Sequence, residues 1–216
     1  MGQKINPQGF RTGILYDWKS IWYANKHTYA DLVAQDHQIR RFLDEKLKLA
    51  GLSQVDIRRS INSIDVYVYV SRPGVVIGRG GANIEELKKD LIKLVNPKGR
   101  VHTNVNLHPM EIAQPDLSAK LIASQIAYQL ERRYPHRRAK DQAIEKVMNA
   151  GAKGIKIVFS GRIGGADIGR QEKYTSGKIP TSTLRADIDF AHVPALTRSG
   201  YVGIKVWIYK GEKHTK

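Results

Sequence analysis

The stretch whose residue types best suit binding chemistry is the loop Gly78-Arg79-Gly80-Gly81. The bracketing glycines, Gly78 and Gly81, can take backbone angles that a residue with a Cβ resists. A turn this bare lets another backbone approach closely, and its amide N–H groups and the Arg79 guanidinium would then face whatever arrives. Such donors suit a sugar-phosphate backbone. Because glycines also cluster in ordinary turns, the loop alone is a weak signal, and the surrounding elements must decide its meaning.

The densest group of basic residues is a second candidate site, at a predicted corner between two helices. An arginine fork matches phosphate with two hydrogen bonds and also stacks on bases. The pattern predicts a patch that follows a phosphate backbone; a solvated helix end is the alternative. The patch consists of Arg132, Arg133, Arg137, Arg138 and Lys140. A looser set is either solvated charge or further RNA contact: Arg162, Arg170, Lys173, Lys178 and Arg185.

Residues for catalysis or metal binding are sparse. Asp187 and Asp189 alternate along a predicted strand, and paired acids can do acid–base or metal chemistry. We expect instead that they lie on the solvent face of that strand. The chain has no cysteine, no Gly-x-x-x-x-Gly-Lys-Ser/Thr phosphate loop and no pair of histidines spaced for zinc. We therefore predict no enzymatic activity, no cofactor, no metal and no small-molecule substrate.

Composition and charge favour a polyanionic partner. The chain has 216 residues, 41% of them hydrophobic, which is enough for one large or two small domains. Lysine and arginine number 36 against 20 acidic residues, a net charge of +16. The basic excess is +7 up to Leu107 and +9 after it, so both halves should attract a polyanion. No apolar run approaches the roughly 18 residues of a membrane span, and no secretory signal is evident. We expect a cytoplasmic protein without a membrane partner.

The elements around the glycine loop follow a recognisable order. Apolar spacing predicts a helix over residues 28–50, and alternation predicts strands over 55–59 and 64–70. After the loop come a helix over 82–94 and a strand over 101–107. This order resembles the type II KH domain, whose glycine loop clamps the backbone of about four nucleotides. We assign residues 21–107 to such a domain, with Arg58, Arg59 and Arg72 as a possible rim.

The second half of the chain predicts an α+β domain, with two helices packed on one face of a β-sheet. Residues 1–20 show no hydrophobic periodicity. They are either a frayed N-terminus or an arm that lies on a binding partner. Residues 108–113 are expected to be a linker, 114–210 the second domain and 211–216 a tail. The predicted helices cover residues 116–134 and 137–150, and the predicted strands 153–160, 183–193 and 201–209.

Several blocks, spread over nearly the whole chain, resemble one known family. Together they are similar to the third protein of the small ribosomal subunit, of bacterial type. The blocks are Gly2-Gln3-Lys4-Ile5-Asn6-Pro7, Gly9-Phe10-Arg11, Val76-Ile77-Gly78-Arg79-Gly80-Gly81, Ala152-Lys153-Gly154-Ile155, Ser160-Gly161-Arg162-Ile163-Gly164-Gly165-Ala166, Leu184-Arg185-Ala186-Asp187-Ile188-Asp189 and Gly203-Ile204-Lys205-Val206-Trp207-Ile208.

The resemblance implies a structural protein of the subunit head that binds small-subunit rRNA and contacts small-subunit proteins ten and fourteen. It also implies that the protein lines the channel through which mRNA enters and helps to hold and unwind mRNA. Arg137 and Arg138 match the family's basic site, but its further lysine is replaced by Asp141 here. For the N-terminal arm, we predict rRNA contacts by Gln3, Lys4, Asn6 and Arg11.

Two other functions remain possible from the residues. A free KH-type RNA-binding regulator or chaperone would share the glycine loop but gives no reason for the blocks of the second domain. A nuclease would need metal or nucleophile constellations that the sequence does not show. Whether the source is a bacterium or an organelle with bacterial-type ribosomes stays open.

Overall fold

The computed structural model describes residues 4–96 and 104–213, and these fall into two compact units. The first comprises residues 18–113. The second combines residues from 114 onward with the N-terminal segment up to Asp17. The N-terminal residues thus fold with the far end of the sequence. No helix within the described ranges is both long and apolar enough to cross a membrane.

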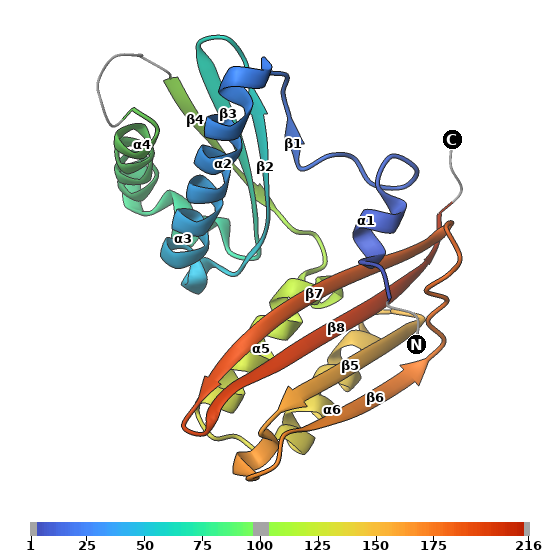
Figure 1. Ribbon diagram of the computed structural model, residues 1–216. Coiled ribbons are helices and arrows are strands. Elements are labelled where there is room, and N and C mark those ends of the chain that lie inside the picture. Colours follow the sequence, from blue (N-terminus) through green and yellow to red (C-terminus); the bar gives the residue numbers. More distant parts are fainter. Residues whose placement is uncertain (1–3, 97–103, 214–216) are drawn as a thin grey trace. The chain divides into compact units, whose positions relative to one another are not determined.

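The first unit has two long helices and a four-stranded mixed sheet (Figure 1). The sheet order is β1-β2-β3-β4, with β2 and β3 antiparallel and the outer pairings parallel. Its elements are β1 Ser20–Ile21, α2 Lys26–Lys46, β2 Leu52–Arg59, β3 Ser63–Val70, α3 Pro73–Ile77, α4 Ala82–Val95 and β4 Asn104–Glu111.

The predicted elements of this unit are confirmed, with one correction. Gly51 ends the first helical stretch in a left-handed conformation (φ 71°), as its place after the apolar period indicated. Strand β4, however, continues through His108 to Glu111, which the sequence suggested was linker. Pro109 is tolerated there because β4 is an edge strand, where a missing N–H costs no ladder hydrogen bond. Residues 101–103 of the predicted strand lie outside the described residues.

A buried ion pair fastens α2 to the sheet of the first unit. Asp36 of α2 lies 2.6 Å from the Arg59 guanidinium, and the two side chains are 3% and 8% exposed. Ser20 and the Trp22 indole also donate to Asp36. The suggestion that Arg59 forms an exposed rim is therefore wrong, because its charge is used inside the unit.

The second unit places two helices on a four-stranded antiparallel sheet of order β6-β5-β8-β7 (Figure 1). The α+β architecture predicted from the sequence is confirmed. The elements are α1 Pro7–Arg11, α5 Ala119–Glu131, α6 His136–Asn149, β5 Gly154–Gly161, β6 Arg170–Gly177, β7 Ala186–Thr197 and β8 Gly200–Glu212.

Strand β6 was not predicted, because it has almost no hydrophobic pattern. Tyr174 is the only hydrophobic residue in Arg170–Gly177, and it packs against the core. β6 is an edge strand held by its full ladder with β5, so backbone hydrogen bonds supply what apolar alternation does not. The expected tail also begins later, since β8 runs to Glu212; residues 214–216 lie outside the described residues.

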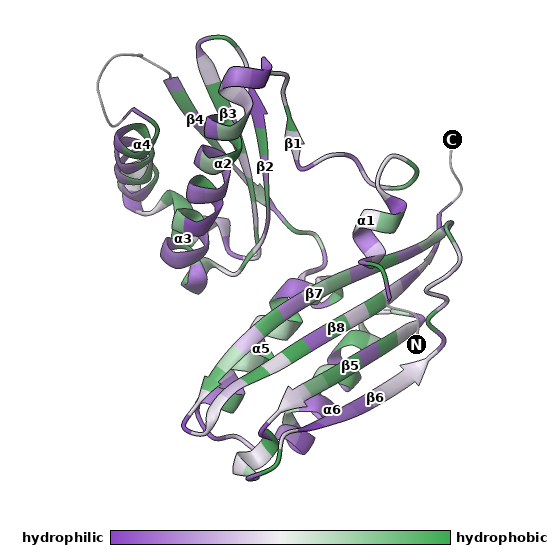
Figure 2. Ribbon diagram, viewed as in Figure 1, coloured by the Kyte–Doolittle hydropathy of each residue, from purple (hydrophilic) through white to green (hydrophobic). Residues whose placement is uncertain are grey.

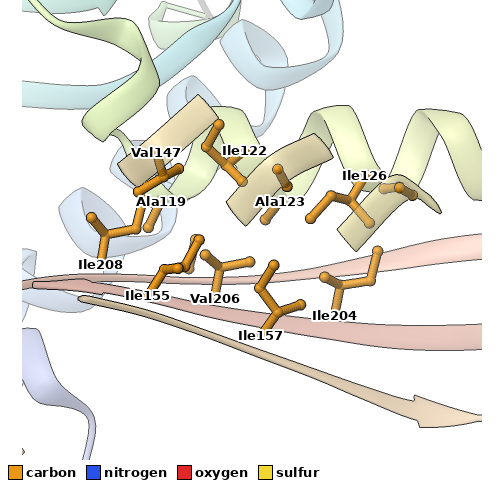
Figure 3. Close-up of a cluster of buried hydrophobic side chains, with 14 of the residues drawn as sticks. Ala119, Ile122, Ala123, Ile126, Val147, Ile155, Ile157, Ile204, Val206 and Ile208 are labelled. Carbon is orange, nitrogen blue, oxygen red and sulfur yellow. The ribbon is translucent and has the colours of Figure 1, made fainter. Parts of the chain in front are cut away.

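The core of this unit explains why the two helices and the sheet form. Alternate residues of the central strands face the helices, and Figure 2 shows hydrophobic and hydrophilic bands alternating along β7 and β8. Figure 3 shows the aliphatic side chains of α5 meeting those of β5 and β8. Burying each valine or isoleucine side chain of this kind contributes roughly 1.5–3 kcal/mol. The labelled residues are Ala119, Ile122, Ala123, Ile126, Val147, Ile155, Ile157, Ile204, Val206 and Ile208.

Candidate RNA-binding surfaces

The glycine loop is built between a short helix and a long one. α3 ends at Ile77, Gly78 turns the chain with φ 72°, and a 3₁₀ turn at Arg79–Gly81 leads into α4. A Cβ on Gly78 would lie 2.6 Å from the Asn83 side chain, so glycine is required there by space as well as by φ. Gly80 (φ 61°) and Gly81 (φ 81°) meet no close neighbour, so their conformation is the reason for glycine.

This loop presents a surface suited to a phosphate. α4 begins after Gly81 without a side-chain cap. The amide of Ala82 donates to the Arg79 carbonyl, and the following amides of the first turn lie at the positive end of the helix dipole. Arg79 is exposed, and no carboxylate partner is found for it within the described ranges. Val75 and Ile77 beside it are 47% and 40% exposed, an apolar border that the sequence reasoning missed. Single-stranded RNA suits such a surface, because its phosphates accept hydrogen bonds and its bases pack against apolar side chains.

The predicted basic patch lies at the corner between α5 and α6. Arg132 caps the end of α5, with its guanidinium 4.3 Å from the centre of the Tyr128 ring. Arg137 and Arg138 occupy the first turn of α6 and are exposed. Within the described part of the chain, none of these arginines has a carboxylate partner. We call Arg132, Arg133, Arg137 and Arg138 the basic corner.

Lys140 differs from the basic corner. Its ammonium lies 2.8 Å from the Asp141 carboxylate and 4.3 Å from the centre of the Tyr174 ring, and its side chain is only 19% exposed. Asp141, which stands where the family has a lysine, therefore neutralises the charge of Lys140. Lys140 is held against the protein and is a weaker phosphate ligand than the arginines beside it.

The looser basic set separates into paired and unpaired residues. Arg162, Arg170 and Arg185 each contact a carboxylate, at 3.1, 2.7 and 3.1 Å respectively. Lys173 and Lys178 are exposed. These residues come from a loop, an edge strand and the connection before β7.

The N-terminal segment, residues 4–17, is docked on the second unit rather than displayed as an arm. Arg11 is fully buried, and Asn6 accepts hydrogen bonds from the amides of Gln8 and Gly9, which begins α1. The prediction that Arg11 contacts rRNA is therefore wrong. Its guanidinium is surrounded by five carbonyl oxygens, those of Ala186, Pro7, Pro180, Thr181 and Thr183.

Lys4 is exposed and stays a predicted RNA contact. Asn6 is exposed too, although its side-chain oxygen serves as the helix cap. Gln3 lies outside the described residues.

The expectation that Asp187 and Asp189 face solvent is also wrong. Asp187 is 5% exposed, accepts a hydrogen bond from the Tyr16 hydroxyl and lies 2.9 Å from the Lys213 ammonium. Burial opposes ionisation of Asp187, but these two hydrogen bonds outweigh it and hold its pKa below the usual range. Asp189 accepts from Gln8 and from the first amide of α5, Ala119.

Both acids thus fasten the N-terminal segment and α5 to β7. They do not form a catalytic pair, and no group of three potential metal ligands occurs within residues 4–96 and 104–213.

One basic residue near the corner escaped the sequence reasoning. Arg198 sits in the turn between β7 and β8, is exposed, and lines the same pocket as Arg133 and Arg162. A lone arginine in Thr197-Arg198-Ser199-Gly200 has the composition of an ordinary turn, so only its place in the fold brings it to notice.

Comparison with known proteins agrees with this geometry. Residues 38–117 match the family model described as KH domain, and residues 126–208 match the one described as ribosomal protein S3, C-terminal domain. Three relatives are each called small ribosomal subunit protein uS3. That of Staphylococcus aureus (strain COL) is 51% identical over 212 residues, covering 98% of this chain and 94% of the relative. That of Shouchella clausii is 50% identical over 212 residues, with the same two coverages, 98% and 94%. That of Persephonella marina is 48% identical over 213 residues, covering 99% and 92%.

The fold and the glycine loop define an RNA-binding protein with a KH domain. The extent of the matches then settles its family: the chain belongs to the bacterial family of small ribosomal subunit protein uS3. This is a family of cytoplasmic ribosomal proteins that act in translation as structural constituents of the small subunit, and not of enzymes.

Proposed function

We propose that the chain binds small-subunit rRNA in the head of the subunit and lines the channel through which mRNA enters, where it helps to hold and unwind mRNA. The observation that carries the mRNA role is the basic corner. Its arginines lie at the corner between α5 and α6 and have no carboxylate partners within the described ranges. Cations that the fold does not neutralise are available to a phosphate backbone.

The two candidate surfaces differ in what they offer to RNA. The glycine loop combines an uncapped helix start with exposed aliphatic residues, which suits a fixed segment of unpaired rRNA. The basic corner offers guanidinium groups with few groups to read bases, which suits an mRNA whose sequence changes continuously. Small-subunit proteins ten and fourteen are the protein neighbours that the family resemblance suggests for the assembled subunit.

The test is to reconstitute small subunits with the Arg137→Ala, Arg138→Ala double variant. Assembly, followed by sedimentation, should be unchanged, while translation through a stable mRNA hairpin should slow several-fold. Removing two phosphate ligands should also lower the salt dependence of binding to single-stranded RNA by about 1.4 in the log–log slope. Lys146→Ala, an exposed change at the far end of α6, is the matched control.

Each other outcome has a definite meaning. If the double variant fails to assemble, the basic corner is an rRNA-binding site and the mRNA role is wrong. If assembly and hairpin passage are both normal, the corner is a solvated helix end. Sedimentation of the wild-type chain in cell lysate covers the other function, because a free RNA-binding regulator would stay at the top of the gradient instead of migrating with the small subunit.

A further inference from the structure

A pocket of about 550 Å³ lies behind the basic corner, within the second unit. It is bordered by the end of α5, the start of α6, the turn after β5 and the turn between β7 and β8. Its volume is within the range of roughly 300–1,000 Å³ that small ligands occupy. The pocket is distinct from the open surface formed by Arg132, Arg137 and Arg138, none of which lines it.

Three arginines lie in the lining of this pocket. Arg133, Arg162 and Arg198 line it, and none of the described residues that line it is acidic. Arg162 is held in place by the Ala166 carbonyl at 2.8 Å and the Asp167 carboxylate at 3.1 Å. Arg133 and Arg198 are exposed, and neither has a carboxylate partner within the described ranges. The lining therefore has an uncompensated positive charge that suits a phosphate.

Backbone donors reinforce this charge. α6 begins at the pocket, and its N-cap, Pro135, has no side chain that could accept from the first amides. These amides lie at the positive end of a helix of 14 residues. Gly165 also lines the pocket, and its φ of 83° is a conformation that favours glycine.

Arg133, which lines the pocket, has an unusual backbone conformation. Among the described residues, Arg133 is the only non-glycine residue with positive φ, at 61°. Its amide donates to the Leu130 carbonyl and that of Tyr134 to the Gln129 carbonyl, each at 2.9 Å. This is a helix end at which glycine is the usual residue. An arginine here is strained, and such strain is commonly retained where the side chain has a function.

We propose that this pocket binds a single nucleotide. Its phosphate would contact Arg133, Arg198 and the first amides of α6, and its base would lie against Tyr134 and Pro135. The nucleotide can be one unit of an RNA strand lying on the basic corner or a free mononucleotide, since the recognised groups are the same. The proposal rests on the proposed RNA-binding function, because Arg133 belongs to the basic corner.

The experiment is titration of the full-length purified chain with a 5′-phosphorylated mononucleotide and with a 5′-phosphorylated RNA hexamer, followed by NMR shifts of the amides of residues 133, 134 and 136–138. Arg198→Ala should weaken binding about tenfold or more, since it removes a charged hydrogen-bond donor. Arg133→Gly should weaken it similarly while raising Tm, because glycine relieves the positive φ. Lys146→Ala should change neither quantity. The nucleoside without phosphate should not bind.

Comparing the mononucleotide with the RNA hexamer shows whether the pocket takes a free nucleotide or one unit of an RNA strand. Mononucleotide binding that Arg198→Ala weakens supports the proposal with a free nucleotide as a source. Binding of the hexamer alone, weakened by Arg198→Ala, supports it with RNA as the source. The proposal is overturned if Arg198→Ala and Arg133→Gly leave both affinities unchanged. The proposed mRNA role can survive that result, because it depends on Arg137→Ala, Arg138→Ala and on hairpin passage.

Discussion

The N-terminal segment and the basic corner both belong to the second unit and both carry arginine, yet they use it in opposite ways. Arg11 is fully buried, and its N–H groups donate to five carbonyl oxygens. Arg137 and Arg138 are exposed and have no carboxylate partner within the described residues. Net charge therefore does not measure RNA-binding capacity, because part of the basic excess stabilises the fold.

The difference follows from where each arginine finds acceptors. The N-terminal segment lies beside the connection that enters β7, where carbonyl groups without strand partners converge on one point. The carbonyls of Pro180 and Thr183 also accept backbone amides, each at 3.3 Å, and the Arg11 guanidinium adds a charged donor to them and to the Thr181 carbonyl. At the basic corner the last turn of α5 is already closed by backbone hydrogen bonds from Arg133 and Tyr134. The arginine side chains there have no carboxylate partner within the described residues and remain available to a ligand.

The largest expected effect is the loss of the buried arginine. Arg11→Ala removes a fully buried guanidinium and its hydrogen bonds to five carbonyl oxygens. We expect it to lower the free energy of unfolding of the second unit by about 3–5 kcal/mol. Arg11→Lys keeps the charge but loses the fork, so its effect should be intermediate. Hydrogen exchange of the β5 and β8 amides in increasing urea reports on this unit separately.

The control for this prediction is Arg41→Ala on α2, which removes an exposed ion pair with Glu45 whose side chains are 75% and 61% exposed. Such a pair is worth no more than about 0.5 kcal/mol. If Arg11→Ala proved as mild as Arg41→Ala, Arg11 would not be a structural residue and its assignment to RNA would have to be considered again.

A charge reversal in the glycine loop tests the opposite extreme, a cation that the fold does not use. Arg79→Asp combined with Gly80→Asp should weaken RNA binding by about 30- to 100-fold, through lost attraction and added repulsion. Gly80 meets no neighbour, and aspartate tolerates its left-handed conformation, so the unit should stay folded. Gly78 is unsuitable for this test, because a side chain there would collide with Asn83.

The matched control is Arg41→Asp with Leu49→Asp, which changes the net charge of the first unit by the same amount at exposed positions. Fluorescence anisotropy with a single-stranded RNA compares the two double variants. Equal loss of affinity in both would mean that only overall charge matters, and the glycine loop would then be an ordinary turn.

The comparison also shows what could be read from the sequence. Local signals were sufficient for α2, α4 and the glycine loop, because apolar spacing and glycine act over a few residues. β6 was missed because its strand is polar and is held by backbone pairing. The role of Arg11 was misread because its partner carbonyl on Ala186 is 175 residues away in the sequence.

The candidate site divides in the same way. The residue types of the basic corner were evident as a cluster in the chain, and the exposed arginines are among them. The pocket behind the corner joins Arg133, Arg162 and Arg198 from three separate parts of the sequence, so no spacing could reveal it. The pairing of Asp187 with Tyr16 and Lys213 was likewise hidden, since alternation along a strand indicates which residues share a face but not what covers that face.

Lys156 gives the smallest expected effect and lies between the two extremes, because it is buried like Arg11 but has no carboxylate partner within the described ranges. It is 9% exposed on β5, with its ammonium 4.8 Å from the centre of the Trp207 ring. Burial, together with the nearby charges of Lys4 and Lys173, lowers the pKa of Lys156 to about 8. In the unfolded chain a lysine titrates near pH 10.4.

Between these two values the unfolded state binds a proton that the folded state has released, so the free energy of unfolding must rise with pH. From pH 7.5 to 10, the wild-type chain should gain about 1–3 kcal/mol relative to Lys156→Met, which cannot titrate. The measurement is urea unfolding of both proteins at several pH values, with the exposed change Lys146→Met as control. Taking the difference between proteins removes the contribution of Tyr16, whose pKa is raised by burial and by its hydrogen bond to Asp187 and which would act in the opposite direction. A difference that stays constant with pH would mean that Lys156 reaches solvent or an anion in the folded state, and it would then belong with the cations available to RNA.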